Sequence, residues 1–339
     1  MARIAVIGAG LIGRKHVELV AGAAELDAVV DADLDTQDVA AAHGVPWYND
    51  VATFLRHHAP DGAIIATPNQ LHVPHALAFI EAGVPLLIEK PIADTSAGAR
   101  RIVEQAARAG VPVLVGHHRR HSSLVRAAKA AIDEGALGRL VSVAAQFWIM
   151  KPDGYFDVTW RTQPGAGPVF INLIHDIDLL RHFCGEVVAV QAAEASAVRG
   201  FAVEDTAAVI LRFDNGVLGT VSISDTVSAP WSWEMTAGEN PAYPKTAEAA
   251  YRIGGTHGAL SVPDLKLWSH PGARSWWAPI EAQDRGVAAD DPLAAQLAHF
   301  LEVVAGRAAP SVTGHDGMRN LAVLEAIKRA CASGTVEVP

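Results

Sequence analysis

The chain is poor in cysteine, in aromatic residues and in long apolar runs. Its 339 residues include only two cysteines, and 6% of them are aromatic. Cys184 and Cys331 lie far apart in the sequence, which is typical of free core thiols rather than of a disulfide framework and favours the cytoplasm. No apolar run approaches the roughly eighteen residues that a membrane-spanning helix needs, so we expect no such helix.

An excess of positive charge and an export signal are also missing. The 27 Lys and Arg residues face 37 Asp and Glu residues, which gives a formal net charge of -10. Because such a chain repels phosphate backbones and anionic lipid, we expect a small-molecule ligand and neither nucleic acid nor a membrane as partner. The first residues, Met1 to Val6, lack the basic region and cleavage site of a signal peptide, so we expect no export.

The N-terminal third has a regular alternation of strand and helix patterns. Short apolar runs at 3–7, 26–30, 62–67, 85–89 and 111–116 are each separated by helix-compatible stretches. Strands that alternate with helices at this spacing are typical of a doubly wound parallel sheet. We therefore predict an N-terminal Rossmann domain over residues 1–120.

Beyond about residue 121 the strand patterns follow one another. A helical stretch at 123–138 comes first, and two amphipathic helices at 292–306 and 317–334 close the chain. Consecutive strands predict a largely antiparallel sheet, so the expected fold is α/β with a second domain over 121–339. The strand patterns between these helices lie at 140–149, 187–195, 206–213, 216–225 and 259–269.

A glycine-rich loop separates the first expected strand from the first expected helix. It reads Gly8-Ala9-Gly10-Leu11-Ile12-Gly13 and matches G-x-G-x-x-G. The first glycine allows a tight turn, the second lets the backbone approach a pyrophosphate, and the third permits close helix packing. Asp31 ends the second expected strand, where a carboxylate can accept hydrogen bonds from the adenosine ribose.

The residues around Asp31 also bear on which dinucleotide binds. Ala32 and Asp33 follow it and provide no Arg for a 2′-phosphate, so the sequence favours NAD over NADP. FAD uses the same fingerprint and is not excluded by the motif alone. An isolated match would indicate only a tight turn, but the strand, the helix and Asp31 together favour a cofactor site.

Four motifs occur in a characteristic order. They are the glycine loop at 8–13, ATPNQLHVPHA at 66–76, Glu-Lys-Pro at 89–91 and GAGPVFINLIHDIDLLRHF at 165–183. In this order and spacing the whole chain resembles the glucose-fructose oxidoreductase / inositol dehydrogenase family, Gfo/Idh/MocA. The resemblance implies a cleft between a Rossmann domain and a C-terminal α/β domain, with oligomerisation through the C-terminal sheet, as a dimer or tetramer.

Members of this family mostly oxidise or reduce sugars, polyols and related cyclic alcohols. Glu89 and Lys90 match the family segment at the nicotinamide and the substrate, and they follow an expected buried strand, at the sheet edge where ligands bind. The alternative for this pair is a solvated ion pair at a strand end. The loop beside the cofactor is matched by Thr67, Pro68, Asn69 and His72.

A polar stripe is expected on the helix that contains the last motif. Asn172, His175 and Asp178 recur every three residues and would share one helix face. By resemblance His175 is the general base, whereas Ile171 stands where the family commonly has Asp. Asn172 can take over substrate hydrogen bonding but supplies no negative charge. Without the resemblance, His175 would be interpreted as a buried histidine that anchors the helix.

Two other basic groups are candidates for substrate selection. Arg161 can pair with a substrate carboxylate or hydroxyl groups, and the basic run 116–121 contributes His118. Their alternatives are stacking of the Arg on Trp160 and a solvated loop. The histidines of the run lack an accompanying metal-ligand pattern, so we predict no metal.

The resulting hypothesis is an NAD-dependent dehydrogenase of CH–OH groups. Lys90 would hold the oxygen of a secondary alcohol and His175 would take its proton while the hydride passes to NAD. Sugars, polyols, inositols and carboxylated cyclic substrates all stay open. One alternative is a lyase or glycosidase that recycles its bound NAD, and another is a non-catalytic protein that senses NAD or a ligand.

Overall fold

The computed structural model describes all residues, 1–339, and they form two compact units. Unit 1 comprises Met1–His118 and Leu293–Leu321, and unit 2 comprises Arg119–Pro292 and Ala322–Pro339. A segment near the C-terminus therefore belongs with the N-terminal part. The domain limits expected from the sequence, 1–120 and 121–339, stay a prediction, and each unit is described below by itself.

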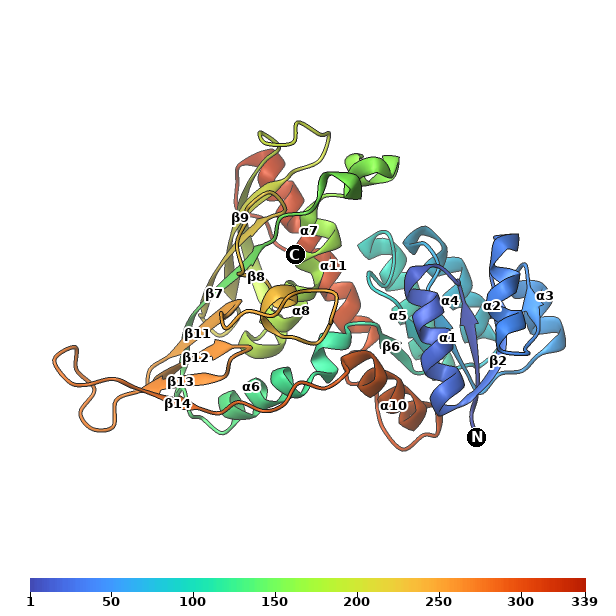
Figure 1. Ribbon diagram of the computed structural model, residues 1–339, viewed down its shortest axis with the longest axis horizontal. Coiled ribbons are helices and arrows are strands. Elements are labelled where there is room, and N and C mark those ends of the chain that lie inside the picture. Colours follow the sequence, from blue (N-terminus) through green and yellow to red (C-terminus); the bar gives the residue numbers. More distant parts are fainter. The chain divides into compact units, whose positions relative to one another are not determined.

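Unit 1, whose N-terminal part is blue to cyan in Figure 1, is built on a six-stranded sheet in which every neighbouring pair is parallel. The strand order is β3-β2-β1-β4-β5-β6, so the order reverses between β1 and β4. The carboxyl ends of the strands at such a reversal form the crevice in which open α/β sheets bind ligands. The strands are β1 (Arg3–Ile7), β2 (Glu25–Val30), β3 (Trp47–Tyr48), β4 (Gly62–Ile65), β5 (Leu86–Ile88) and β6 (Val113–Val115).

Helices connect these strands, and short local signals set where they begin and end. The Thr95 side chain accepts a hydrogen bond from Gly98 N before α5, and Gly110 ends that helix in the left-handed conformation at φ +68°. Asp50 caps α3 through Thr53 N in the same way. The helices are α1 (Leu11–Ala23), α2 (Gln37–Ala42), α3 (Val51–His57), α4 (His72–Glu81), α5 (Ser96–Ala109) and α10 (Pro292–Val304).

Unit 2 contains an eight-stranded sheet of order β14-β13-β12-β11-β7-β10-β9-β8. Neighbours are antiparallel except for the parallel pair of β7 and β10, so the α/β class with a largely antiparallel second sheet is confirmed. The strands are β7 (Leu140–Trp148), β8 (Val187–Ala195), β9 (Thr206–Phe213), β10 (Leu218–Ser224), β11 (Tyr251–Gly255), β12 (Gly258–Val262), β13 (Lys266–Ser269) and β14 (Glu281–Asp284).

One face of this sheet is covered by helices. Helix α6 packs on β12, α8 on β7 and α7 on β10, and strict alternation of buried and exposed residues along β9 places Leu211 and Phe213 in the core beneath them. No helix in the chain is both long and apolar enough to cross a membrane. The helices of unit 2 are α6 (Ser123–Asp133), α7 (Pro168–Ile171), α8 (Leu173–Cys184) and α9 (Trp233–Thr236), and α11 (Gly314–Ser333) begins in unit 1 and ends in unit 2.

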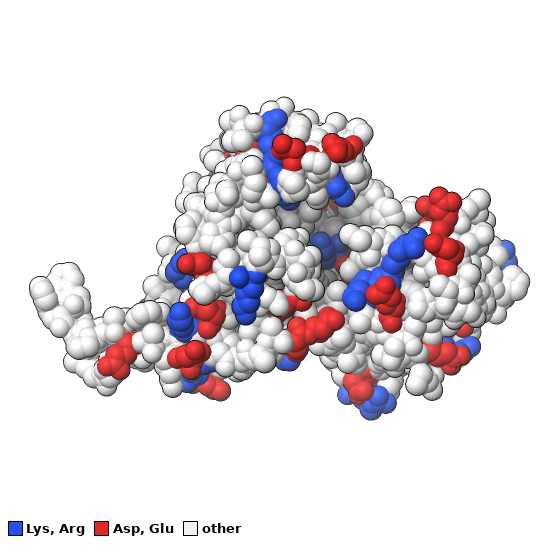
Figure 2. Space-filling model, in the orientation of Figure 1, with Lys and Arg blue, Asp and Glu red and all other residues white.

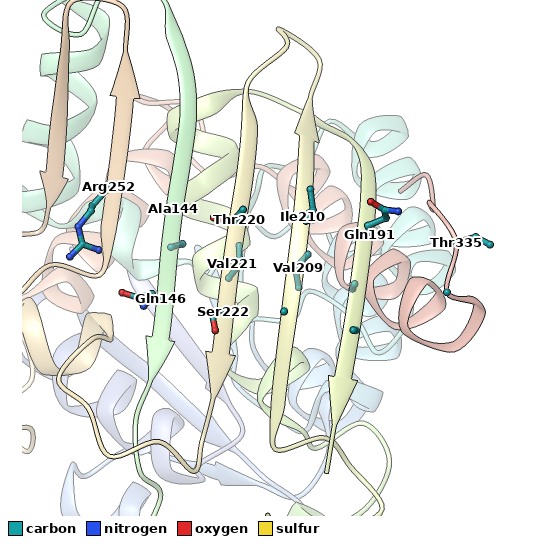
Figure 3. A pocket seen from close by; sticks show the side chains of 15 residues that line it. Ala144, Gln146, Gln191, Val209, Ile210, Thr220, Val221, Ser222, Arg252 and Thr335 are labelled. Atoms are coloured by element: carbon teal, nitrogen blue, oxygen red, sulfur yellow. The ribbon is translucent and has the colours of Figure 1, made fainter. Parts of the chain in front are cut away.

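The other face of the sheet is open. A hollow of about 600 Å³ lies over β11, β7, β10, β9 and β8. Figure 3 shows side chains that line it, among them Ala144, Ile210 and Thr220. Ile210 is 49% exposed on this face. Arg252 is the only charged residue that lines the hollow. An apolar surface of this kind is unusual on a chain that functions alone.

Local structure differs from the sequence expectation in several places. The stretch 259–269, expected as one strand, forms β12 and β13 around a turn in which Leu265 has φ +56°, because Pro263 has no N–H for a continuing ladder. The single helix expected from the INLIHDID stretch is interrupted at Asn172, between α7 and α8. The sequence pattern also missed three strands: β3 has only two residues, β11 alternates buried and exposed residues only at its start, and β14 is exposed throughout.

Candidate active-site residues

The glycine loop of unit 1 brings β1, α1 and the end of β4 into close contact. Gly8 has φ +93°, and a Cβ there would lie 2.6 Å from the carbonyl carbon of Ala66. A Cβ on Gly13 would lie 2.0 Å from the oxygen of Gly8. By contrast, a Cβ on Gly10 would meet no atom within 4 Å. Gly8 and Gly13 are therefore required for packing, and Gly10 leaves open space before the helix.

The N-terminus of α1 has the properties of an anion site. No side chain caps it, and no acidic residue lies in its first turn. Leu11, in that turn, is 96% exposed. The amide groups of Leu11, Ile12 and Gly13 and the positive end of the helix dipole suit a pyrophosphate.

Asp31 follows β2 and is fixed to the glycine loop. Its Oδ2 accepts a hydrogen bond from Ala9 N at 2.6 Å, and its Oδ1 accepts one from Asp33 N at 2.9 Å. Each carboxylate oxygen can accept a further hydrogen bond. Asp31 is thus held where the glycine turn begins, and its contact with the ribose stays a prediction.

The loop after β4 contains the residues Thr67, Pro68, Asn69 and His72. His72 is buried and lies between two backbone carbonyls: its Nε2 is 2.8 Å from Thr67 O and its Nδ1 is 2.9 Å from Pro91 O. A neutral imidazole ring can donate a hydrogen bond to only one of these carbonyls. Both carbonyls raise the pKa of His72, but burial outweighs them and lowers it. His72 therefore joins the loop after β4 to the segment after β5, whereas Thr67, Pro68 and Asn69 are partly or fully exposed.

Glu89 and Lys90 directly follow β5. Glu89 is 6% exposed, and its Oε1 lies 2.8 Å from His16 Nε2 on α1. Its Oε2 accepts a hydrogen bond from Lys90 N at 3.2 Å. Burial raises the pKa of Glu89, but the hydrogen bond with His16 and the charges of His16, Lys90 and His118 outweigh it and lower the pKa to about 2. The alternative of a solvated ion pair is wrong for Glu89, which is a buried anion behind Lys90.

The polar residues of α8 in unit 2 have different environments. The backbone N–H of His175 donates to the backbone carbonyl of Asn172 at 3.1 Å, and Asn172 Oδ1 accepts from Lys151 Nζ at 2.9 Å. Asp178 is bound by Arg120 through two hydrogen bonds of 2.7 and 2.8 Å. The three polar residues expected on one helix face therefore do not share one role. Asp178 belongs to a buried ion pair, and His175 stays the candidate general base.

Part of the basic run 116–121 is buried, so the alternative of a solvated loop is wrong. Arg119 donates to Glu234 at 2.6 Å and to Asp176 at 3.3 Å, and its guanidinium carbon lies 5.5 Å from the centre of the Trp233 ring. Burial raises the pKa of Asp176, and Arg119 and Tyr251 offset this only partly, so the pKa is about 6. His118 is half-buried in unit 1, and its charge helps to lower the pKa of Glu89.

Arg161 contacts an aromatic ring, but not mainly that of its sequence neighbour. Its guanidinium carbon is 4.1 Å from the centre of the Tyr155 ring and 5.7 Å from that of Trp160. Its Nη1 donates to Tyr155 O at 2.7 Å. The role of Arg161 in binding substrate stays a prediction.

Lys151 is the polar residue that sequence reasoning missed. It lies shortly after β7, and besides Asn172 it contacts Asp225 Oδ2 at 3.4 Å. A lysine after an apolar strand pattern was the signal that pointed to Lys90, and the same signal was present here. It was overlooked because no known motif surrounds Lys151.

The charged side chains on the face in Figure 2 are of both signs and scattered, with no continuous basic patch. Exposed charged residues of the chain form pairs of opposite sign, such as Arg307 with Glu302 at 2.6 Å and Lys15 with Glu18 at 3.5 Å. No group of three or more His, Cys, Asp or Glu residues is arranged to hold a metal ion.

Comparison with known proteins identifies the family. Residues 2–117 match the oxidoreductase family with an NAD-binding Rossmann fold, and residues 125–261 match the GFO/IDH/MocA C-terminal domain. The chain belongs to the GFO/IDH/MocA oxidoreductase family. The resemblance seen in the sequence is confirmed.

Relatives with assigned activities cover most of the chain. The 1,5-anhydro-D-fructose reductase of Ensifer adhaerens is 30% identical over 81% of this chain and 78% of its own. Inositol 2-dehydrogenase 2 of Saccharopolyspora erythraea is 28% identical over 98% of this chain and 94% of its own. This GFO/IDH/MocA protein is therefore an oxidoreductase with an NAD-binding Rossmann fold.

Solved structures agree with this assignment. The WlbA dehydrogenase of Bordetella pertussis, in complex with NADH and UDP-GlcNAcA, has a TM-score of 0.79 and 25% identity, and the match covers 100% of this chain and 98% of that one. A levoglucosan dehydrogenase in complex with NADH and L-sorbose has a TM-score of 0.82 at 20% identity, covering 100% and 99%. The latter likeness shows the shared fold.

Proposed function

We propose that the enzyme transfers a hydride between NAD and a secondary alcohol of a sugar, polyol, inositol or related cyclic substrate, with Lys90 and His175 as the acid/base pair. The observation that carries the proposal is the fixed backbone of Lys90 at the carboxyl end of β5, beside the buried anion of Glu89. The relatives that reduce anhydrofructose or oxidise inositol support this substrate class.

Each of these residues has a distinct chemical task. Bound NAD supplies the hydride acceptor. The Lys90 ammonium group donates a hydrogen bond to the alcohol oxygen and stabilises negative charge that develops there. His175 accepts the hydroxyl proton, for which an imidazole is suited because its ordinary pKa lies near neutral pH.

The residues of unit 1 that would hold NAD follow from the geometry of the glycine loop. The amides after Gly10 suit the pyrophosphate, and the carboxylate of Asp31 suits the ribose hydroxyl groups. A 2′-phosphate would lie beside Asp31 and Asp33, so NAD is preferred over NADP. The loop residues Thr67, Pro68 and Asn69 would contact the cofactor at the end of β4.

The decisive experiment is an assay for NADH at 340 nm. Purified enzyme is incubated with NAD or NADP and a panel of sugars, inositols, polyols, sugar acids and cyclic dihydrodiols, and products are followed by chromatography. We expect NADH with one substrate class, and losses of at least about a hundredfold in kcat for Lys90→Ala and His175→Ala with little change in NADH affinity. Unchanged turnover in either variant would remove that residue from the mechanism.

The same assay separates the alternatives. A substrate that is consumed without net NADH would indicate a lyase or glycosidase that recycles NAD. Saturable NADH binding without any turnover would indicate a sensing protein. Fluorescence titration of NADH with each variant shows whether a loss of activity arises from lost cofactor binding.

We also propose that the enzyme forms a homo-oligomer, a dimer or tetramer, through the open face of the unit 2 sheet. The apolar hollow and the half-exposed Ile210 support this, since burying them against a second copy removes apolar surface from water. Light scattering after size-exclusion chromatography should show a smaller particle for Ile210→Arg. The control Leu34→Arg changes an exposed leucine of unit 1 and should leave the mass unchanged.

A cytoplasmic location is proposed from the state of the cysteines. Cys184 and Cys331 are both free thiols, and burial raises the pKa of Cys184 to about 12. Free, unreactive thiols are typical of a reducing compartment. Cell fractionation with an antibody to the native enzyme tests this, and recovery from the periplasm or the medium would contradict it.

A further inference from the structure

Lys151 in unit 2 is a buried cation with an unusual set of partners. The residue is 9% exposed, and its Nζ lies 2.9 Å from Asn172 Oδ1 and 3.4 Å from Asp225 Oδ2. It also lies 4.9 Å from the centre of the Tyr155 ring. Its nearest hydrogen-bond partner is thus a neutral amide, and Asn172 is the residue at which α7 ends and α8 begins.

A second cation contacts the same ring. The guanidinium carbon of Arg161 is 4.1 Å from the centre of the Tyr155 ring. Its hydrogen bond goes to a backbone carbonyl, and its buried Nε has no hydrogen-bond partner. Arg161 forms no ion pair with a carboxylate, so two cations contact the Tyr155 ring and only Lys151 has a carboxylate beside it, that of Asp225.

The nearby carboxylates are already engaged by other cations. Asp225 accepts a hydrogen bond from Arg199 Nε at 3.0 Å, in addition to its longer contact with Lys151. Glu234 also acts on Lys151 through its charge, but its Oε1 accepts from Arg119 at 2.6 Å. The charge of Lys151 is therefore only partly balanced, and Arg161 adds a second positive charge at Tyr155.

We propose that Lys151 and Arg161 form a subsite that binds the carboxylate of an acidic sugar or polyol substrate. The proposal rests on the proposed dehydrogenase function and names its substrate class. Arg161 offers a planar donor group that matches a carboxylate, and Lys151 offers a point charge. The Tyr155 ring holds both cations near the position of the incoming anion.

Other properties of Lys151 agree with a ligand of opposite charge. Burial lowers the pKa of Lys151, the charge and hydrogen bond of Asp225 offset this in part, and Arg199 lowers the pKa further. A carboxylate beside Nζ would favour the charged amine, so the buried lysine gains more from an anionic substrate than an exposed one would. Asn172 supplies no negative charge to Lys151, so a substrate carboxylate would supply it.

Matched substrate pairs test the subsite. Initial rates with NAD are measured for D-glucuronate against D-glucose and D-galacturonate against D-galactose, with the wild type and the variants Lys151→Gln and Lys151→Arg. We expect the wild type to prefer the acids. Lys151→Gln should raise KM for an acid by roughly 10- to 100-fold, the range for losing a hydrogen bond to a charged group.

The variants also separate a subsite from a structural contact. Lys151→Gln should lower kcat/KM for an acid at least about tenfold more than for its neutral partner sugar, so the acid-to-neutral ratio falls, and Lys151→Arg should restore most of that ratio because it keeps the charge. Lys266→Gln, an exposed lysine on β13, serves as the matched control. Equal losses with acids and neutral sugars, or a wild type that prefers the neutral sugars, would overturn the proposal.

Binding measurements keep the proposal testable if no compound is turned over. Thermal shifts of the NADH-loaded enzyme are recorded with D-glucuronate and with D-glucose. Stabilisation by the acid alone, lost in Lys151→Gln and kept in Lys266→Gln, would support the subsite while the dehydrogenase proposal failed. No selective stabilisation by the acid would overturn the subsite, whatever the activity assay shows.

Discussion

Glu89 in unit 1 and Asp176 in unit 2 are both buried carboxyl groups, yet their pKa values move in opposite directions. The pKa of Glu89 is lowered to about 2, and that of Asp176 is raised to about 6. Burial raises both, so burial does not explain the difference. The difference lies in the neighbouring charges.

Glu89 is the acid among basic neighbours, since His16 binds its Oε1 and Lys90 and His118 add positive charge. Asp176 shares a single Arg119 with Glu234, and Glu234 raises its pKa. Unit 1 therefore keeps a permanent anion behind Lys90, whereas the carboxyl group next to His175 titrates near neutral pH. In these two buried carboxyl groups, the balance of neighbouring charges decides the direction in which the pKa moves.

The largest effect is expected from removing the cation of the unit 2 cluster. Arg119→Met keeps the length of the side chain but leaves Asp176 and Glu234 without their shared partner. We expect the free energy of unfolding to fall by about 3–5 kcal/mol, the usual range when one member of a buried ion pair is lost. Urea denaturation at pH 7 measures this, with the exposed Arg139→Met as control. A loss below about 1 kcal/mol would show that the cluster is not electrostatically coupled.

The next effect concerns the anion of unit 1. Because the folded-state pKa of Glu89 is below its ordinary value of 4.5, its stabilising contribution is present above pH 4.5 and is lost as the pH falls towards 2. Glu89→Gln should therefore lower the free energy of unfolding by about 3 kcal/mol at neutral pH, and the two proteins should converge near pH 2. Urea denaturation across this range, with the exposed Glu81→Gln as control, checks the slope.

More of unit 1 than of unit 2 could be predicted from the sequence. The glycine loop, Asp31 and the apolar strands are local patterns, and each was interpretable within a few residues. The partner of Glu89 was not, because His16 is 73 residues away and nothing in α1 distinguishes it from other helical histidines. The direction of the Glu89 pKa shift therefore depended on a contact that only the folded chain provides.

The ion pairs of Arg119 in unit 2 join residues that are still farther apart in the sequence. Arg119 is separated from Asp176 by 57 residues and from Glu234 by 115. The sequence showed a basic run and a motif with two aspartates but could not pair them. Lys151 and Asn172 were likewise separate in the sequence, and their contact depends on the break between α7 and α8, which the apolar period of that stretch did not predict.

The smallest of the three effects concerns Asp176, for which stability should depend on pH in the direction opposite to that expected for Glu89. The folded-state pKa of Asp176 is above its ordinary value of 3.8, so its favourable contribution is present below pH 3.8 and is lost as the pH rises to about 6. Asp176→Asn removes this titration but keeps an oxygen that can accept from Tyr251 and Arg119.

The free energy of unfolding of the Asn variant, relative to that of the wild type, should therefore rise by up to about 3 kcal/mol between pH 4 and pH 7. Weaker hydrogen bonds should lower the stability of the variant by about 1 kcal/mol at every pH. The difference in unfolding free energy between variant and wild type is measured at each pH, with the exposed Asp157→Asn as control. A flat difference would mean that Asp176 is ionised throughout, because Arg119 and Tyr251 would then be sufficient partners. Opposite slopes for Glu89→Gln and Asp176→Asn would instead establish that the neighbouring charges, and not burial, set the charge of each carboxyl group.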